Sequence, residues 1–164
     1  GVVAAFQIGT SRLFDDDPRF GLVVLSEIAG RALSPAVNDP GTAIDIIGTL
    51  VRLFVLWTET AADADPTAPK YDRIEVPQLA VRDMFDDAFT AIARDGAGTV
   101  EVAVRLQKAL DALASIGDAP IREAAEYHGQ LALKRALVTL SMSEDLTVVR
   151  AAAKFATSSA SSTN

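Results

Sequence analysis

Residues 17–42 read DPRFGLVVLSEIAGRALSPAVNDPGT, and this stretch decides the fold. It contains two aspartate–proline pairs, Asp17–Pro18 and Asp39–Pro40. An aspartate carboxylate can accept hydrogen bonds from the free N–H groups at the start of a helix, and proline suits the first helical position because it lacks an N–H. The stretch therefore predicts one helix that begins at Pro18, a polar turn, and a second helix that begins at Pro40.

The two predicted helices differ in their apolar pattern. The first should end before Pro35, because the residue before a proline avoids helical backbone. Its apolar stripe, expected to face the core, consists of Phe20, Val24, Ile28 and Ala32, with Leu25 and Ala29 alongside. The second helix, residues 42–58, is apolar almost all round. A membrane span needs about 20 apolar residues, and Asp45 and Arg52 interrupt a shorter run here, so we expect the buried centre of a bundle.

Four further helical patterns follow a predicted loop at residues 60–70. The first should stop at Gly96, the second should run from Thr99 to Gly117, and the third should start with Asp118 as its cap. The apolar residues of the first two have helical spacing and should face the core. These residues are Val81, Phe85, Ala88, Ile92, Val102, Leu106, Leu110 and Leu113.

The last helix and two minor features complete the expected fold. Ser141 and Glu144 have the spacing of a capping box. Residues 73–76 alternate in polarity and predict a short strand, and the Ser/Thr-rich residues 157–164 predict a disordered tail. The predicted fold class is all-α, a bundle of about six helices with one short strand at most, formed as a single domain by residues 1–156.

Composition restricts the possible functions. The 164-residue chain has a formal net charge of −7, so nucleic-acid binding and docking on anionic lipid are both disfavoured. It has no cysteine, which excludes disulfides and thiolate-bound metals, and its single histidine, His128, leaves no histidine-rich metal site. The chain begins at Gly1 without an initiator methionine, and we expect it to be part of a longer protein. A mean hydropathy of +0.23 indicates some apolar surface that meets a partner.

No motif predicts a catalytic or metal centre. Glu123 and Glu126 precede His128, but the paired Glu-x-x-His motifs of di-iron bundles are absent. The sequence has no G-x-S-x-G nucleophile motif, and the glycines at residues 96–98 lack the pattern of a phosphate-binding loop. The carboxylates of α-helical spacing within residues 83–87 are expected on a solvent face. We therefore expect no catalytic residue, no metal and no cofactor.

One long run of residues nevertheless resembles a known family. The run RALSPAVNDPGTA at residues 31–43, together with DPRFGL at residues 17–22, is similar to the bacterial predicted membrane proteins grouped as domain of unknown function 2254. Its members have transmembrane helices followed by a soluble C-terminal region, which this chain resembles. The chain departs from the family pattern at Ala36, where glycine is common, and at residues 14–16. The resemblance implies a soluble domain of a membrane-anchored protein and implies no activity.

The turn between the first two helices is the leading candidate site. Five polar residues there could surround a small ligand or anion at the start of the second helix, where N–H groups favour negative charge. The alternative is structural, with side chains that cap helices and satisfy turn carbonyls. The five residues are Arg31, Ser34, Asn38, Asp39 and Thr42.

A second candidate is the polar face of the second helix, formed by Asp45, Thr49 and Arg52 at helical spacing. These residues could line a cavity or an oligomer interface. Each charge could equally pair with a neighbouring helix, and Arg31 is the expected partner of Asp45, because an unpaired buried charge is costly.

Together these observations favour a non-enzymatic accessory or interaction domain of a bacterial membrane protein. It is expected to act by self-association through a helix face or by docking on its own transmembrane region. The alternative function is a small-ligand sensor or enzyme that uses the turn from Arg31 to Thr42.

Overall fold

The computed structural model describes residues 17–63 and 79–154, with the backbone alone at residues 60–63. This part of the chain forms six α-helices and no strand, which confirms the predicted all-α bundle. The predicted strand, the predicted tail and residues 14–16 lie outside the described residues. The helices are α1 (Pro18–Ala32), α2 (Pro40–Asp63), α3 (Val81–Asp95), α4 (Val100–Ile116), α5 (Ala119–Thr139) and α6 (Ser143–Ala152).

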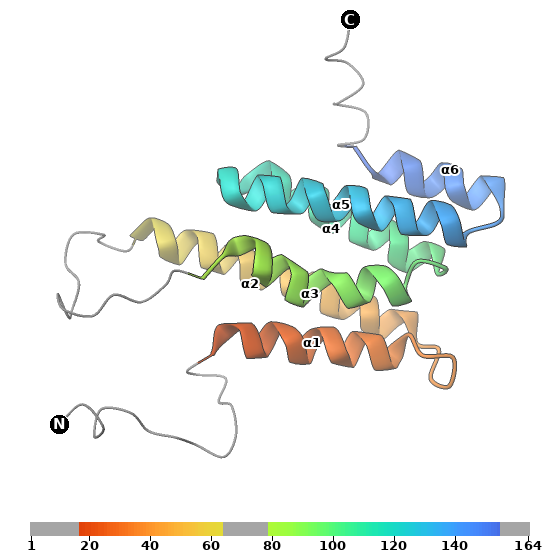
Figure 1. Cartoon of the computed structure of the whole chain (residues 1–164), viewed down its shortest axis with the longest axis horizontal. Helices are drawn as coiled ribbons and strands as arrows, with labels where there is room; N and C mark the ends of the chain where they lie inside the picture. The colour runs from red at the N-terminus through yellow and green to blue at the C-terminus, as the bar shows by residue number, and fades with distance from the viewer. Residues whose placement is uncertain (1–16, 64–78, 155–164) are drawn as a thin grey trace, which may run out of the picture.

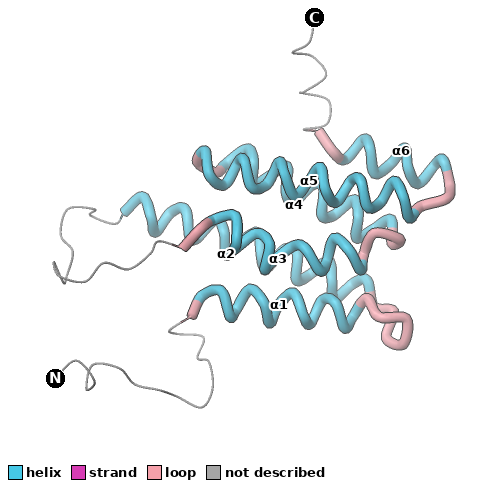
Figure 2. Tube along the Cα trace, in the orientation of Figure 1, coloured by secondary structure: helices cyan, strands magenta, loops and turns pink. Residues whose placement is uncertain are grey.

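The helices form two layers (Figure 1). The helices α1, α3 and α5 lie side by side and run in the same direction, while α2 and α4 return behind them. In the second layer α2 packs on α4 and α4 packs on α6, and contacts of α1 with α2 and of α5 with α4 and α6 join the layers. Short loops connect most successive helices (Figure 2). The pair α1 and α2 therefore forms one end of the stack.

Aspartate caps start two of the helices as predicted. The carboxylate of Asp17 accepts a hydrogen bond from the N–H of Phe20 at 3.0 Å, at the start of α1. The carboxylate of Asp118 accepts one from the N–H of Ile121 at 3.2 Å, at the start of α5. Each bond satisfies an N–H group that has no partner inside its own helix.

The predicted caps of α4 and α6 differ from the structure. Thr99 occupies the expected position before α4, but its side chain makes no capping bond. The capping box of Ser141 and Glu144 is wrong, because α6 begins only at Ser143. The hydroxyl of Ser143 donates to the Glu144 carboxylate at 2.9 Å instead, so the two side chains of the first turn satisfy each other.

Aromatic side chains from three helices meet in the core. The ring centroids of Phe54 on α2 and Phe85 on α3 are 4.4 Å apart, and Phe85 lies 5.4 Å from Phe89. Phe85 also contacts the imidazole of His128 on α5, at 5.9 Å between centroids. The apolar faces predicted for α3 and α4 are buried at all positions except Val81, which is half-buried.

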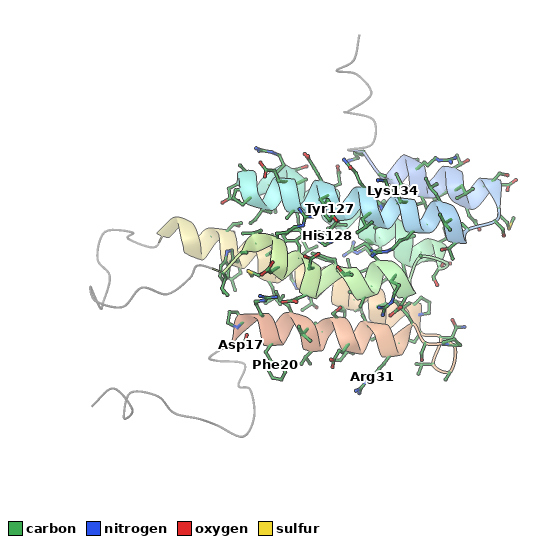
Figure 3. All side chains as sticks on the ribbon, in the orientation of Figure 1. Asp17, Phe20, Arg31, Tyr127, His128 and Lys134 are labelled. Carbon is green, nitrogen blue, oxygen red and sulfur yellow. The ribbon has the colours of Figure 1, made fainter. Side chains whose placement is uncertain are left out.

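The predicted core stripe of α1 is right for Ala29 and Ala32, which are buried, and wrong for its larger outward residues. Ile28 is 44% exposed, and Phe20 and Val24 are only half-buried. Figure 3 shows Phe20 on the side of α1 that faces away from the other helices. The buried positions of α1 are largely small, with Ser26 and Ala29 among them, so α3 can approach this side closely and the larger residues lie outside.

The helix α2 is less buried than predicted. It packs on α1 and α4, which bury Leu50 and Phe54, while Leu53 and Leu56 on its outer side are exposed. Its segment Pro40–Glu59 is long and apolar enough to cross a membrane by length and composition, and only 33% of its most apolar window is buried. The expectation of a fully buried central helix is therefore wrong for the outer side of α2.

His128 is a buried polar group at the contact between α3 and α5, with 2% of its side chain exposed. Its Nε2 lies 3.2 Å from a carboxylate oxygen of Asp86 but has no hydrogen-bond partner in the described part of the chain. Burial lowers the pKa of His128, and the cations Arg82 and Arg135 lower it further, against the opposing effect of Asp86. The imidazole is therefore held in its neutral form.

We expect the free energy of unfolding to fall as the pH drops below 6.5, the ordinary pKa of histidine. Because the folded-state pKa is lowered, the unfolded chain binds the proton first, and stability is lost until the pH reaches the folded-state pKa. The slope is at most about 1.4 kcal/mol per pH unit. Urea denaturation across this pH range measures it. The variant His128→Gln should lose this part of the pH dependence, and an unchanged slope would contradict the assignment.

Candidate functional site

The turn between α1 and α2 closes through its own backbone. The N–H of Asn38 donates to the carbonyl of Ser34, and the N–H of Asp39 donates to the carbonyl of Ala32, both at 2.8 Å. The Ser34 hydroxyl donates to the carbonyl of Arg31 at 2.7 Å. Asn38 has a φ of 50°, in the left-handed region that asparagine tolerates better than most residues other than glycine. Asn38 is the one described residue other than glycine with a positive φ, so its conformation contributes to the shape of the turn.

Asp39 caps α2, as predicted for the structural alternative. One carboxylate oxygen accepts the N–H of Thr42 at 3.1 Å, and the other accepts the Thr42 hydroxyl at 2.6 Å. These bonds lower the pKa of Asp39, the hydroxyl contributing most and the N–H next. The side chains of Asp39 and Thr42 are therefore used by the fold itself.

Two of the five predicted ligand residues have side chains that form no hydrogen bond or ion pair with the described part of the chain. The guanidinium of Arg31 and the amide of Asn38 are exposed and make no hydrogen bond or ion pair with the residues that the structure describes. Figure 3 shows Arg31 pointing away from the bundle. The turn thus places Ser34, Asp39 and Thr42 in structural contacts and leaves two groups at the surface. Ligand binding by the five residues stays a prediction.

The polar face of α2 is satisfied along its own helix. Arg52 donates to the Thr49 hydroxyl at 2.8 Å, and Thr49 donates to the carbonyl of Asp45 at 3.0 Å. Asp45 and Arg52 are exposed, and within the described residues no ion pair joins Asp45 to Arg31. The expected ion pair of Arg31 with Asp45 is wrong. Both side chains face solvent, where an unpaired charge costs little free energy.

The aspartates of α3 have more contacts than a solvent face would give them. The guanidinium of Arg19 on α1 donates to the carboxylate of Asp87 at 2.6 Å and lies 3.2 Å from that of Asp83, so it links α1 to α3. The Asp87 contact in particular raises the pKa of Arg19. Asp86 faces His128 instead. In the described part of the chain, no group of three or more His, Asp or Glu side chains could hold a metal ion.

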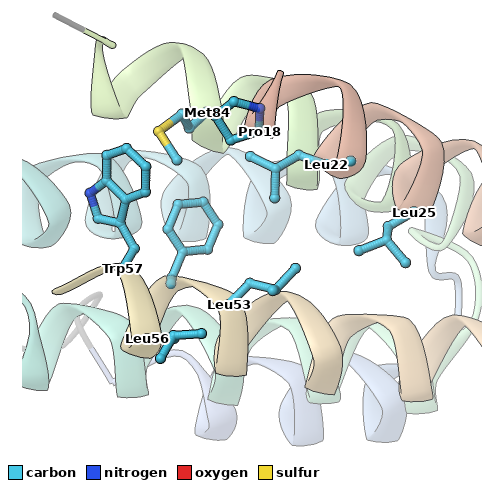
Figure 4. A pocket seen from close by; sticks show the side chains of 9 residues that line it. Pro18, Leu22, Leu25, Leu53, Leu56, Trp57 and Met84 are labelled. Carbon is cyan, nitrogen blue, oxygen red and sulfur yellow. The ribbon is translucent and has the colours of Figure 1, made fainter. Parts of the chain in front are cut away.

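The structure reveals an apolar groove that sequence reasoning missed. It has a volume of about 350 Å³ and lies between α1 and the second half of α2. Figure 4 shows Trp57 and Leu53 of α2 across from Leu22 and Met84. The lining of the groove comes from three helices, so spacing along the sequence could not predict it. The excess of apolar residues on α2 was the one sequence feature that indicated an apolar surface here. The lining residues are Pro18, Gly21, Leu22, Leu25, Leu53, Phe54, Leu56, Trp57 and Met84.

We expect Asn38→Ala to destabilise the chain by about 1 kcal/mol, because a Cβ without a compensating polar group is disfavoured at positive φ. Asn38→Gly should cost little or nothing, since glycine adopts this conformation freely. Urea denaturation of the two variants beside the natural chain measures the difference. Equal losses in both variants would show that the Asn38 side chain, rather than its backbone conformation, stabilises the turn.

Comparisons with known proteins place these features in a family. A family described as "Predicted membrane protein (DUF2254)" matches residues 1–112. An uncharacterized protein of Mycobacterium bovis and two of Mycobacterium tuberculosis are each 55% identical to the chain over 40 residues. This stretch is 24% of the chain and 8% of each relative, so the chain matches only a small part of the length of each relative.

No solved structure is significantly similar to the chain. The family match covers well over half of the 164 residues and includes α1, α2, α3 and most of α4. The resemblance of the run at residues 31–43 is thereby confirmed. The chain belongs to the DUF2254 family of predicted membrane proteins.

Proposed function

We propose that this chain is an interaction domain of a bacterial membrane protein, and that it docks on an apolar helix of that protein's membrane-embedded part. The groove between α1 and α2 is the surface that would accept this helix. One observation carries the proposal: none of the nine residues that line the groove is charged.

The chemistry of the groove supports an apolar helix as its occupant. Grooves of this kind bind the apolar face of a helix through side chains spaced by one turn. Leu53 and Leu56 on the groove are 41% and 58% exposed, and fully burying a leucine is worth roughly 1.5–3 kcal/mol. Polar metabolites and charged peptides would find few hydrogen-bond partners there, which disfavours both.

The family supports a membrane-embedded partner over a second copy of the chain. Every residue of the groove lies within the matched residues 1–112, and the family is described as a membrane protein. The aligned stretch is 24% of this chain and 8% of each mycobacterial relative, so those relatives are about three times as long. Proteins of that length have room for membrane-spanning helices that could reach the groove.

A crosslinking experiment tests the proposal. The 164 residues contain no cysteine, so Leu53→Cys offers one position for a photoreactive maleimide label once any cysteine elsewhere in the full-length protein is replaced by serine. In the natural full-length protein in bacterial membranes, we expect this label to crosslink to an apolar helix of the same polypeptide, identified by mass spectrometry of the joined peptides. The matched control is Val148→Cys on α6, which replaces an apolar residue of similar exposure and should give no such crosslink.

The crosslinked product separates the possible occupants. A product with twice the mass of one polypeptide, joined at the groove, would replace the proposal with self-association through this surface. A label at residue 53 that crosslinks no more than the one at residue 148 would overturn docking at the groove altogether.

The turn supports a second candidate function, binding of a small ligand or anion. The observation that favours it is the pair of uncommitted groups, the Arg31 guanidinium and the Asn38 amide. In a thermal-shift screen against oxyanions and common metabolites, a ligand at a hundredfold excess over its Kd adds about 2.7 kcal/mol of stability. Asn38→Gly, which keeps the backbone shape, and Arg31→Gln should both abolish the shift. A shift that survives both substitutions would exclude the turn.

A further inference from the structure

A second groove, of about 380 Å³, lies where α3 and α5 end. Three of its six lining residues are cations and none is an acid, although the whole chain has a net charge of −7. The cations come from two helices that are far apart in the sequence, so no local sequence motif predicts that they lie together. The lining residues are Arg94, Ala97, Lys134, Arg135, Val138 and Thr139.

Two of the three cations lack a counter-charge. Arg94 holds Asp95 through two hydrogen bonds, at 2.7 and 3.0 Å. Lys134 and Arg135 form no ion pair with any residue that the structure describes. The Nη1 of Arg135 is buried and has no hydrogen-bond partner there. Lys134 is exposed and Arg135 is half-buried, so the groove carries positive charge that no described carboxylate neutralises by direct contact.

Helix termini do not explain these cations. Basic residues stabilise the last turn of a helix by their interaction with its dipole, and Arg94 occupies that position in α3. The helix α5, which is described in full, has no basic residue in its last turn. Lys134 and Arg135 stand before that turn, where the dipole effect has declined.

The turn before α4 forms another wall of the groove and adds positive potential. Ala97 lines the groove, and a Cβ on Gly98 would lie 3.2 Å from the Thr139 methyl group, so the turn packs against the end of α5. The 17-residue helix α4 begins directly after this turn, and Thr99 does not cap it with its side chain. Its free N–H groups favour an anion nearby.

We infer that this groove is a phosphate-binding site, which takes the phosphate group of a lipid headgroup or of a soluble compound. Lys134 and Arg135 would supply charge-assisted hydrogen bonds, which are the strongest that side chains make to phosphate. Val138, which is 89% exposed beside them, would meet whatever carries the phosphate. Asp95 neutralises Arg94 at the edge of the groove, so Lys134 and Arg135 supply its net positive charge, and acids more than about 8 Å away are screened at physiological salt.

The whole chain, titrated with inorganic phosphate at constant ionic strength and followed by amide NMR, tests the site. Saturable shifts are expected at residues 97–99 and 134–139. Lys134→Gln should weaken the apparent affinity roughly tenfold. Lys108→Gln on α4 is the matched control, because Lys108 is also an exposed lysine and does not line the groove. This variant should bind as the natural chain does.

Sedimentation with vesicles separates the two sources of phosphate. Binding to phosphatidylglycerol vesicles but not to phosphatidylcholine vesicles, reduced by Lys134→Gln alone, would assign the groove to anionic headgroups. Inorganic phosphate binding without vesicle binding would assign it to soluble phosphate compounds. The inference is overturned if neither probe binds, or if Lys108→Gln weakens binding as much as Lys134→Gln does.

Discussion

The two layers are joined at their ends by the packing of α4 on α5 and of α1 on α2, and at the centre by aromatic rings. Phe54 of α2 lies 4.4 Å from Phe85 and 5.8 Å from Phe89 of α3, so these rings bring α2 and α3 into contact across the layers. Phe85 in turn contacts His128 on α5. Tilted aromatic pairs contribute energy beyond the burial of their area, and burial beside them lowers the pKa of His128.

Two surfaces at different places on the bundle carry side chains without partners among the described residues. At the α1–α2 end, apolar side chains of α2 have no neighbour on their outer side because no further helix of the described part packs there. At the ends of α3 and α5, the side chains without a counter-charge are the cations Lys134 and Arg135. The first surface can be completed by burial of hydrocarbon and the second by charge, so partners of different chemistry would use them without competing.

The sequence predicted those features that short-range chemistry determines. The starts of α1, α2 and α5 follow from an aspartate and a nearby proline, and the stops at Gly96 and Gly117 follow from glycine. The outward position of Phe20, Val24 and Ile28 could not be predicted, because the core side of α1 also includes Leu22 and the small polar Ser26, which lie outside the predicted stripe. Helical spacing predicts that a helix has an apolar stripe, but it does not predict which neighbouring helix covers that stripe.

The candidate sites divide in the same way. The role of Asp39 as a cap could be predicted from its sequence neighbours, whereas the aspartates of α3 acquired partners from α1 and α5 that are far away in the chain. The two grooves are assembled from several helices each, and no spacing along the chain could have brought their residues together in advance.

The end of the family match at residue 112 falls inside a helix whose neighbour lies outside the match. That position is about one turn before the end of α4, and α5 covers α4 along the interface that contains Gln107 and Gly129. A polypeptide cut at this boundary would leave the leucine face of α4 in water. The residues outside the family match, which include α5 and α6, therefore cover apolar side chains of residues inside it.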